Sequence, residues 1–376
     1  PVCTPARASI LPGHYPSRHG AYHVGVSLPP EYPTLTKRLS EAGYFTGLLG
    51  KAHFQPCLDP GSFEAAPHIF DRDFFRDWDG PYYGFEYAQL VIGHTAEEHA
   101  AGMHYGLWLE ENGIGIDDNF GNCEYTAYGA WALPERYHGS RWVADRTIEA
   151  VDIAREEGRP FFLWASFQDP HNPYLVTEPW ASMYDPADLP AYAAIEGEME
   201  DKPPFYRAVF EDGPTYGADP DLKHHGWGDV RVRPEMDRRA RRELLAAYYG
   251  MVSLVDHHLG RIVEALAARN LLDDTLVVFT SDHGEYTGNH GLWGKGLPAY
   301  EDAQRVPFVV CHPDCVTPGA ESHALQSLVD VGVTCLSAAG LELPPGVQGV
   351  DQQPAWIDAG KRVREWAMVE FRPAES

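Results

Sequence analysis

The stretch that decides the fold is TLVVFTSDHG, residues 275–284, in which an uncharged, mostly apolar run leads into an acid and a histidine. Residues 275–280 carry no polar alternation, so they predict a strand that is covered on both faces. Residues 236–270 precede them with apolar side chains in helical step and predict one long helix. A long helix that leads into a doubly buried strand is typical of an α/β protein.

The same order of helix and strand recurs along the chain. Residues 33–43 (PTLTKRLSEAG) predict a helix that stops at a glycine, and residues 44–49 a strand. Further pairs are a helix over 140–158 before a strand over 160–167 (PFFLWASF), and a strand over 307–311 before a helix from about 324 to 339. We therefore expect the α/β class, with a mostly parallel sheet flanked by helices on both sides.

Two irregular stretches, about 58–135 and 173–235, interrupt this alternation. Long insertions in α/β enzymes often line or cover the site, and we expect them to carry substrate specificity. The aromatic run 71–87 (DRDFFRDWDGPYYGFEY) could stack on a sugar ring, although core packing explains most such aromatics.

Composition narrows the class of protein. The chain has 376 residues, room for one large domain with an appendage or for two domains, and its 44% hydrophobic content is that of a globular protein. It carries 29 basic and 55 acidic residues, a formal charge of −26, which argues against nucleic acid as a partner. No apolar run is long enough to predict a membrane span. Six cysteines without a CxxC pair leave the redox compartment open, so periplasmic or secreted and cytoplasmic locations both remain.

Polar residues follow three of the predicted strands, where ligands gather in open α/β sheets. They are Gly50-Lys51-Ala52-His53, Gln168-Asp169-Pro170-His171 and Ser281-Asp282-His283-Gly284, with Lys295 further on. Each has a simpler structural explanation when taken singly, as a loop or a helix cap. Together they offer lysines for a tetrahedral anion and an acid-histidine pair for a divalent metal, so their joint occurrence favours a site.

Cys3 supplies a candidate nucleophile. It lies just before Pro5 and a predicted helix over 6–11. A helix N-terminus offers amide donors and the positive end of the dipole, which favour a developing negative charge. The structural alternative is a small buried apolar side chain.

Residues 3–16, CTPARASILPGHYP, resemble the sulfatase signature Cys-x-Pro-Ser-Arg-x-x-x-Leu-Thr-Gly-x-x-Pro. Residues 43–46 (GYFT) with 50–53 (GKAH) resemble the second sulfatase signature, and the spacing of the later motifs also fits. The resemblance covers residue 1 to about 349. It implies an alkaline-phosphatase-like fold and hydrolysis of a sulfate ester, and Cys-x-Pro-x-Arg is the part that a formylglycine-generating or sulfatase-maturing enzyme reads.

The resemblance also implies roles for individual residues. Cys3 would be oxidised to formylglycine, whose hydrate attacks sulfur beside a divalent cation, usually Ca²⁺, with Mg²⁺ or Mn²⁺ as alternatives. Arg7 would orient the diol, and Lys51 and Lys295 would bind the sulfate. His53 would contact the diol and act in sulfate elimination, and His171 would protonate the leaving oxygen. Asp282, His283 and the modified Cys3 would bind the metal.

The sequence departs from the family pattern in four places. Ala6 replaces a serine, Pro12 a threonine and, in the metal pair, His283 stands where many members have asparagine. The family's first strand, which ends in two aspartates that complete the metal site, would precede Pro1. We therefore expect a fragment, with residues 1–345 as the catalytic domain and 346–376 as the start of a smaller, truncated C-terminal subdomain.

Two other functions stay open from the sequence. A phosphonate monoester or phosphodiester hydrolase resembles sulfatases in fold, formylglycine and the acid-histidine pair. An inactive protein that binds sulfated ligands is the alternative from another class. For the sulfatase function, we expect a sulfated carbohydrate or a small sulfate ester as substrate.

Overall fold

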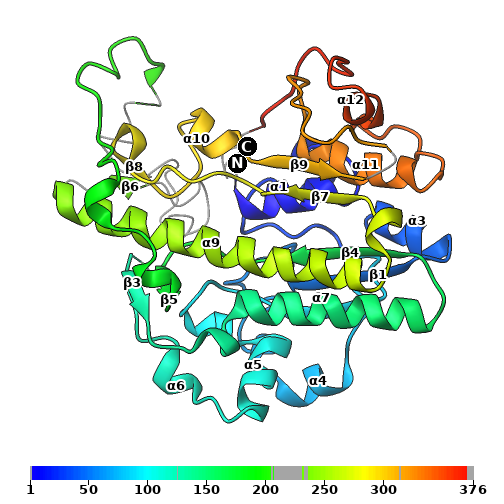
Figure 1. Ribbon diagram of the computed structural model, residues 1–376, viewed down its shortest axis with the longest axis horizontal. Coiled ribbons are helices and arrows are strands. Elements are labelled where there is room, and N and C mark those ends of the chain that lie inside the picture. The colour runs from blue at the N-terminus through cyan, green and yellow to red at the C-terminus, as the bar shows by residue number, and fades with distance from the viewer. Residues whose placement is uncertain are drawn as a thin grey trace.

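The computed structural model describes residues 2–124, 126–204, 206, 231–232, 236–312 and 315–370 (Figure 1). Its strands are β1 (Phe45–Lys51), β2 (Tyr87–Val91), β3 (Tyr128–Trp131), β4 (Phe161–Ser166), β5 (Tyr174–Thr177), β6 (Arg231–Val232), β7 (Val277–Thr280), β8 (Leu292–Trp293) and β9 (Phe308–Cys311). Its α-helices are α1 (Cys3–Ile10), α2 (Pro16–His19), α3 (Leu35–Glu41), α4 (Arg72–Asp77), α5 (Met103–Glu111), α6 (Ile116–Asn119), α7 (Gly139–Glu156), α9 (Arg238–Ala268), α10 (Glu301–Gln304), α11 (Leu328–Ala338) and α12 (Gln353–Ile357). Short 3₁₀ turns lie between them, including η3 (Glu135–Tyr137).

The central sheet is parallel and has the strand order β2-β1-β4. Gly47 of β1 pairs with Tyr87 on one side and with Leu163 on the other. Because β1 has a strand on each edge and helices on each face, all seven of its residues are buried. The carboxyl ends of the three strands therefore lie at one edge, where Lys51 ends β1.

Helices cover both faces of this sheet, as alternate residues of β4 show. Phe161 and Leu163 pack against α7 and α9, whereas Phe162 packs with Leu39 of α3 and Leu336 of α11. In Figure 1, α7 and α9 run side by side across the sheet, with α1, α3 and α11 on its other side. The predicted α/β class, with a mostly parallel sheet between helical layers, is confirmed.

Strands β7 and β9 form a separate antiparallel pair, in which Val278 pairs with Val310. A groove of about 1120 Å³ is lined in part by β4 and β7, including Leu163 and Val277. In the part of the chain that the structure describes, β4 and β7 each pair along one edge only.

The sequence located the main elements within a few residues, with one correction at the first helix. It begins at Cys3, three residues before the expected start, because Pro5 has no N–H to donate but is tolerated in a first turn. The insertion at 58–135 folds into α4, α5, α6, β2 and β3, and its buried side chains pack into clusters shared with the rest of the fold, such as Leu48 of β1 and Trp142 of α7. In it, Phe75 and Phe85 are buried, so the aromatic run packs the interior rather than offering a stacking surface. The insertion at 173–235 is described in part, since residues 207–230 lie outside the described residues.

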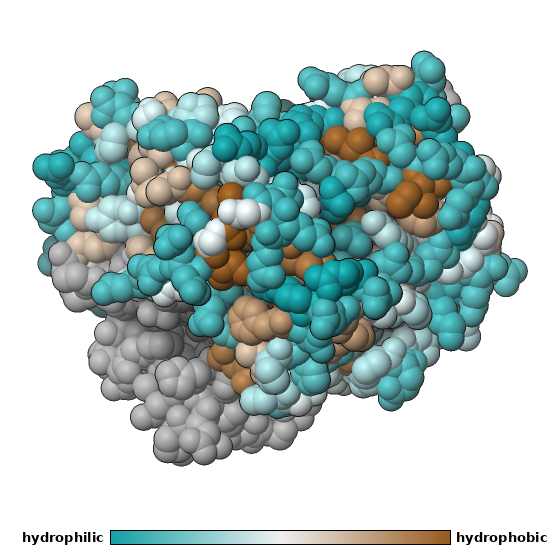
Figure 2. All heavy atoms as spheres, turned by 90° about the horizontal axis from the view of Figure 1, so that it is seen from below, coloured by the Kyte–Doolittle hydropathy of each residue, from teal (hydrophilic) through white to brown (hydrophobic). Residues whose placement is uncertain are grey.

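The surface is dominated by polar side chains. Figure 2 shows one face on which hydrophobic residues gather mainly near the middle, between hydrophilic ones. None of the described helices is long and apolar enough to cross a bilayer.

Candidate active site

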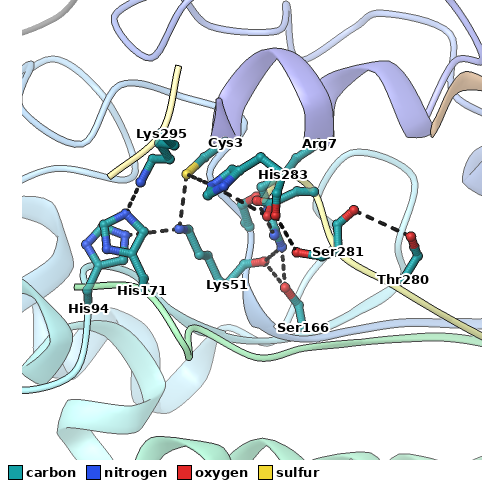
Figure 3. Close-up of polar contacts among 12 residues, drawn as sticks. Cys3, Arg7, Lys51, His94, Ser166, His171, Thr280, Ser281, His283 and Lys295 are labelled. Atoms are coloured by element: carbon teal, nitrogen blue, oxygen red, sulfur yellow. Dashed lines mark hydrogen bonds and ion pairs between the residues drawn. The ribbon is translucent and has the colours of Figure 1, made fainter. Parts of the chain in front are cut away.

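Cys3 lies at the N-terminus of α1, buried at the carboxyl edge of the sheet. Its Sγ atom is 3.5 Å from the Lys51 Nζ atom and 3.2 Å from the His283 Nε2 atom (Figure 3). Burial acts to raise the pKa of the Cys3 thiol, but the positive charges of Lys295 and Lys51 hold it well below its usual value. The pocket around Cys3 is thus locally positive in an acidic protein and suits an anion.

Lys51 and His53 reach this pocket because β1 ends in a sharp turn. Gly50 has φ +112, and a Cβ atom there would lie 2.0 Å from the Ser166 carbonyl oxygen, so only glycine lets β1 and β4 approach so closely. His53 itself has φ +56 and is buried. Among described residues neither of its ring nitrogens has a hydrogen-bond partner. Burial acts to lower the pKa of His53, but the thiols of Cys3 and Cys57 raise it to about 9.

His171 and Lys295 lie on the other side of Cys3. The His171 Nδ1 atom is 2.6 Å from the Asn172 carbonyl oxygen, so Nδ1 carries a proton and donates it. The Nε2 atom then accepts from the Lys295 ammonium group. Burial, followed by the charge of Lys295, lowers the pKa of His171 to about 4, so its ring is neutral near pH 7. Its Nε2 faces the space beside Cys3, as Figure 3 shows.

Asp282 and His283, which follow β7, form a ligand group with Cys3 whose donor atoms all lie within 4.8 Å of one another. The His283 Nδ1 atom lies 2.9 Å from the Gly284 carbonyl oxygen and donates to it, which leaves the Nε2 lone pair facing Cys3. A backbone acceptor behind one ring nitrogen is the usual support for a metal-ligating histidine. Burial acts to raise the pKa of Asp282, but His283 and Arg7 lower it to about 2, so it is a carboxylate. These residues fit a divalent cation.

Arg7 contacts residues at the carboxyl ends of β1, β4 and β7, next to the ligand group of Cys3, Asp282 and His283. Its guanidinium donates to the Asp282 carboxylate at 3.1 Å, to the Ala52 carbonyl at 2.8 Å, and to the Lys51 carbonyl and Ser166 hydroxyl. These contacts support a role in holding Asp282, while orientation of a diol by Arg7 stays a prediction.

Replacement of Arg7 by methionine is expected to destabilise the protein by about 3 kcal/mol, because it leaves the half-buried Asp282 carboxylate without the guanidinium that pairs with it. Urea unfolding followed by circular dichroism measures the change. The matched control is Arg38→Met at an exposed position of α3, where a loss within about 0.5 kcal/mol is expected. An Arg7→Met protein as stable as that control would contradict the role of Arg7 in holding Asp282.

A second group of ligand-type side chains, Glu135, His257 and His258, lies between η3 and α9. Arg261, which can only donate, lies 3.3 Å from the His258 Nδ1 atom, so the ring proton is on Nε2. That nitrogen faces the Glu135 carboxylate at 3.3 Å. The pair is therefore better explained as a polar contact of a neutral histidine between η3 and α9 than as a metal site.

His94 is a site residue that the sequence reasoning missed. It follows β2, and its Nε2 atom lies 3.0 Å from the Lys51 Nζ atom. Its ring stacks on His171 with centroids 3.3 Å apart and planes 7° apart. The signal was available, since His94 comes three residues after a strand whose carboxyl end lies beside that of β1, but only the sheet order reveals it. All eight residues predicted from the sequence lie at or directly around this edge, and Figure 3 labels Cys3, Arg7, Lys51, His171, His283 and Lys295 among them.

The fold and the site define an alkaline-phosphatase-like α/β protein with two lysines and an acid-histidine pair at one sheet edge. The chain belongs to the sulfatase family, whose family model matches residues 1–341. It is 29% identical to an arylsulfatase of Clostridium perfringens over 93% of this chain and 67% of that protein. It is 28% identical to a choline-sulfatase of Rhizobium meliloti over 94% of this chain and 62% of that protein.

Solved structures share the fold. A phosphonate monoester hydrolase of Agrobacterium radiobacter is 26% identical, with a TM-score of 0.71 over 96% of this chain and 68% of that chain. The chain thus spans 62 to 67% of the length of the two curated relatives.

Proposed function

We propose that this chain forms the catalytic part of a sulfuric ester hydrolase, which cleaves a sulfate monoester into an alcohol and inorganic sulfate. The observation that carries the proposal is the convergence of Cys3 with Lys51 on one side and His283 on the other, at 3.5 and 3.2 Å. The signature around Cys3 and membership of the sulfatase family support the same reaction.

The nucleophile in this proposal derives from Cys3, which a maturing enzyme oxidises to formylglycine. One hydroxyl of the hydrated aldehyde attacks sulfur, and the bond between sulfur and the alcohol oxygen breaks. Binding of the sulfate ester would draw the Lys295 ammonium group onto a sulfate oxygen, so that the His171 Nε2 atom takes up a proton from solvent and then delivers it to the leaving oxygen. His53, whose pKa the Cys3 thiol no longer raises once that thiol has been oxidised, would then take the proton of the second hydroxyl, so that sulfate leaves and the aldehyde is restored. Lys51 and Lys295 neutralise charge on the sulfate oxygens throughout.

The ligand group of Cys3, Asp282 and His283 would hold the divalent cation, for which Ca²⁺ is the first choice and Mg²⁺ or Mn²⁺ the alternatives. When bound, such a cation lowers the pKa of a neighbouring hydroxyl and offsets negative charge on the substrate. Arg7 keeps Asp282 ionised and in place for it. We further propose a sulfated carbohydrate or a small sulfate ester as substrate, with residues 1–345 as the catalytic domain and 346–376 as the start of a smaller C-terminal subdomain.

A phosphonate monoester hydrolase is the second candidate function, favoured by the structural likeness to the Agrobacterium radiobacter enzyme. The two functions share a nucleophile and a cation. Their substrates are both monoanions, and they differ in that a carbon substituent on phosphorus takes the place of one oxygen on sulfur.

Steady-state kinetics with an aryl sulfate and an aryl phosphonate monoester of the same leaving group distinguish the two functions. We expect kcat/KM to be higher for the sulfate ester, because it offers three non-bridging oxygens to the two lysines, whereas the phosphonate ester offers two oxygens and a carbon substituent. A preference for the phosphonate ester would overturn the proposal in favour of the second candidate. Mass spectrometry of the Cys3 peptide, from protein made in its native host, is expected to show formylglycine; unmodified cysteine would instead support an inactive, ligand-binding protein.

A further inference from the structure

We propose that His94 and Glu97 form a positioning pair that aims the Lys51 ammonium group into the anion pocket. The inference rests on the proposed function only in taking Lys51 as an anion ligand. His94 follows β2, and Glu97 lies one turn further along the chain. Neither residue belongs to the motifs that identified the site.

The direction of the hydrogen bonds follows from the donor inventory of the side chains. The Glu97 Oε2 atom lies 3.1 Å from both the backbone N–H and the Nδ1 atom of His94. An ionised carboxylate only accepts, so the His94 Nδ1 atom carries the proton and its Nε2 atom presents a lone pair. A lysine ammonium only donates, so Lys51 donates to that lone pair at 3.0 Å. The Glu97 carboxylate, the His94 imidazole and the Lys51 ammonium group thus form one chain of hydrogen bonds.

This chain of hydrogen bonds orients the flexible side chain of Lys51. A lysine has four rotatable bonds, and fixing them costs up to about 2 kcal/mol in side-chain entropy. Among the described residues, the Lys51 ammonium group contacts His94 Nε2 and Cys3 Sγ, at 3.0 and 3.5 Å. Two of its three N–H groups are then directed by the protein, and the third is held where an oxygen of a tetrahedral anion at Cys3 can accept it.

The stacked rings of His94 and His171 extend the arrangement to the second lysine. The ring planes are 7° apart, and each ring turns its Nδ1–H toward an acceptor and its Nε2 toward a lysine. His94 thereby accepts a hydrogen bond from Lys51 in the same way as His171 accepts one from Lys295. The two imidazoles differ in what lies behind them, a carboxylate for His94 and a backbone carbonyl for His171, which gives His94 the stronger acceptor nitrogen.

The test measures anion affinity directly, by titration calorimetry of the purified full-length enzyme with inorganic sulfate. His94→Phe keeps a flat ring against His171 but removes both nitrogens. It is expected to weaken sulfate binding about 10- to 100-fold, the range of a hydrogen bond to a charged group. His94→Gln, which can still accept from Lys51, is expected to bind sulfate within about 3-fold of the unaltered enzyme.

A double-mutant cycle separates positioning from packing. If His94 acts through Lys51, the His94→Phe change has no further effect on sulfate affinity in a Lys51→Ala background. Glu97→Gln, at the far end of the chain of hydrogen bonds, is also expected to weaken sulfate binding, but by less than His94→Phe does. It provides the same test if the His94→Phe protein does not fold.

Equal sulfate affinity in the His94→Phe and unaltered enzymes, or additive effects in the cycle, would overturn the inference. Failure of the proposed function looks different. In that case the unaltered enzyme still binds inorganic sulfate and His94→Phe still weakens binding, but the aryl sulfate is not turned over.

Discussion

Cys3→Ala is expected to lower kcat for sulfate ester hydrolysis by at least about 10⁴-fold, because it removes the only atom from which the proposed nucleophile can be made. Lys51, Lys295 and His171 remain in place around the vacated position. The affinity for inorganic sulfate is therefore expected to stay within about 10-fold of the unaltered protein. A large loss in kcat with a small loss in affinity is the pattern of a residue that acts in the chemical step.

Steady-state kinetics and sulfate titration of the same preparations measure both quantities. Cys311→Ala is the matched control, since it makes the same change at an exposed position of β9. It is expected to leave kcat and affinity unaltered within about 2-fold. A Cys3→Ala protein that retains more than a tenth of the activity would show that another group attacks the ester.

Acid is expected to unfold the protein steeply between about pH 6.5 and pH 4, because several histidines are buried in the neutral form. Burial is the main cause that lowers the pKa of His19, His104 and His171 to about 4. Their hydrogen bonds agree with neutral rings, since His19 Nδ1 accepts from a backbone N–H at 3.1 Å and His104 Nδ1 accepts from another at 2.9 Å. Protonation of either nitrogen would break such a contact.

The sign of the effect follows from proton binding. These groups have a lower pKa in the folded state, so below their ordinary value of about 6.5 the unfolded chain binds more protons. Their contribution is fully present above pH 6.5 and is lost as the pH falls to about 4. Three such groups give a slope of about 4 kcal/mol per pH unit in that window. The loss in unfolding free energy over this pH range is comparable to a typical folding free energy of about 5–15 kcal/mol.

Urea unfolding at pH 7, 6 and 5, followed by circular dichroism, measures the slope. His19→Gln is expected to reduce it by about 1.4 kcal/mol per pH unit, because one titrating group is removed. His323→Gln is the control, since His323 is exposed and its change is expected to leave the slope unaltered. Stability that is constant or rises from pH 7 to pH 5 would contradict the expectation.

Much of the site could be predicted because its residues follow strands. Hydrophobic runs located β1, β4 and β7, and the chemistry lies directly after each, as Lys51, His171 and Asp282 show. The N-terminal cysteine needed a different signal, the match of residues 3–16 to a family signature. Periodicity alone placed the start of its helix three residues late, because a proline in a first turn reads like a helix boundary.

Local sequence determined which segments are helices and strands, and which side chains could do chemistry at their ends. Those properties depend on hydrophobic period and on residue type, both of which are written along the chain. The order of the strands depends instead on contacts between residues far apart in sequence, which no local pattern encodes. Only the tertiary structure therefore placed β2 beside β1, brought His94 within 3.0 Å of Lys51, and set Arg7 on Asp282 across 275 residues of chain.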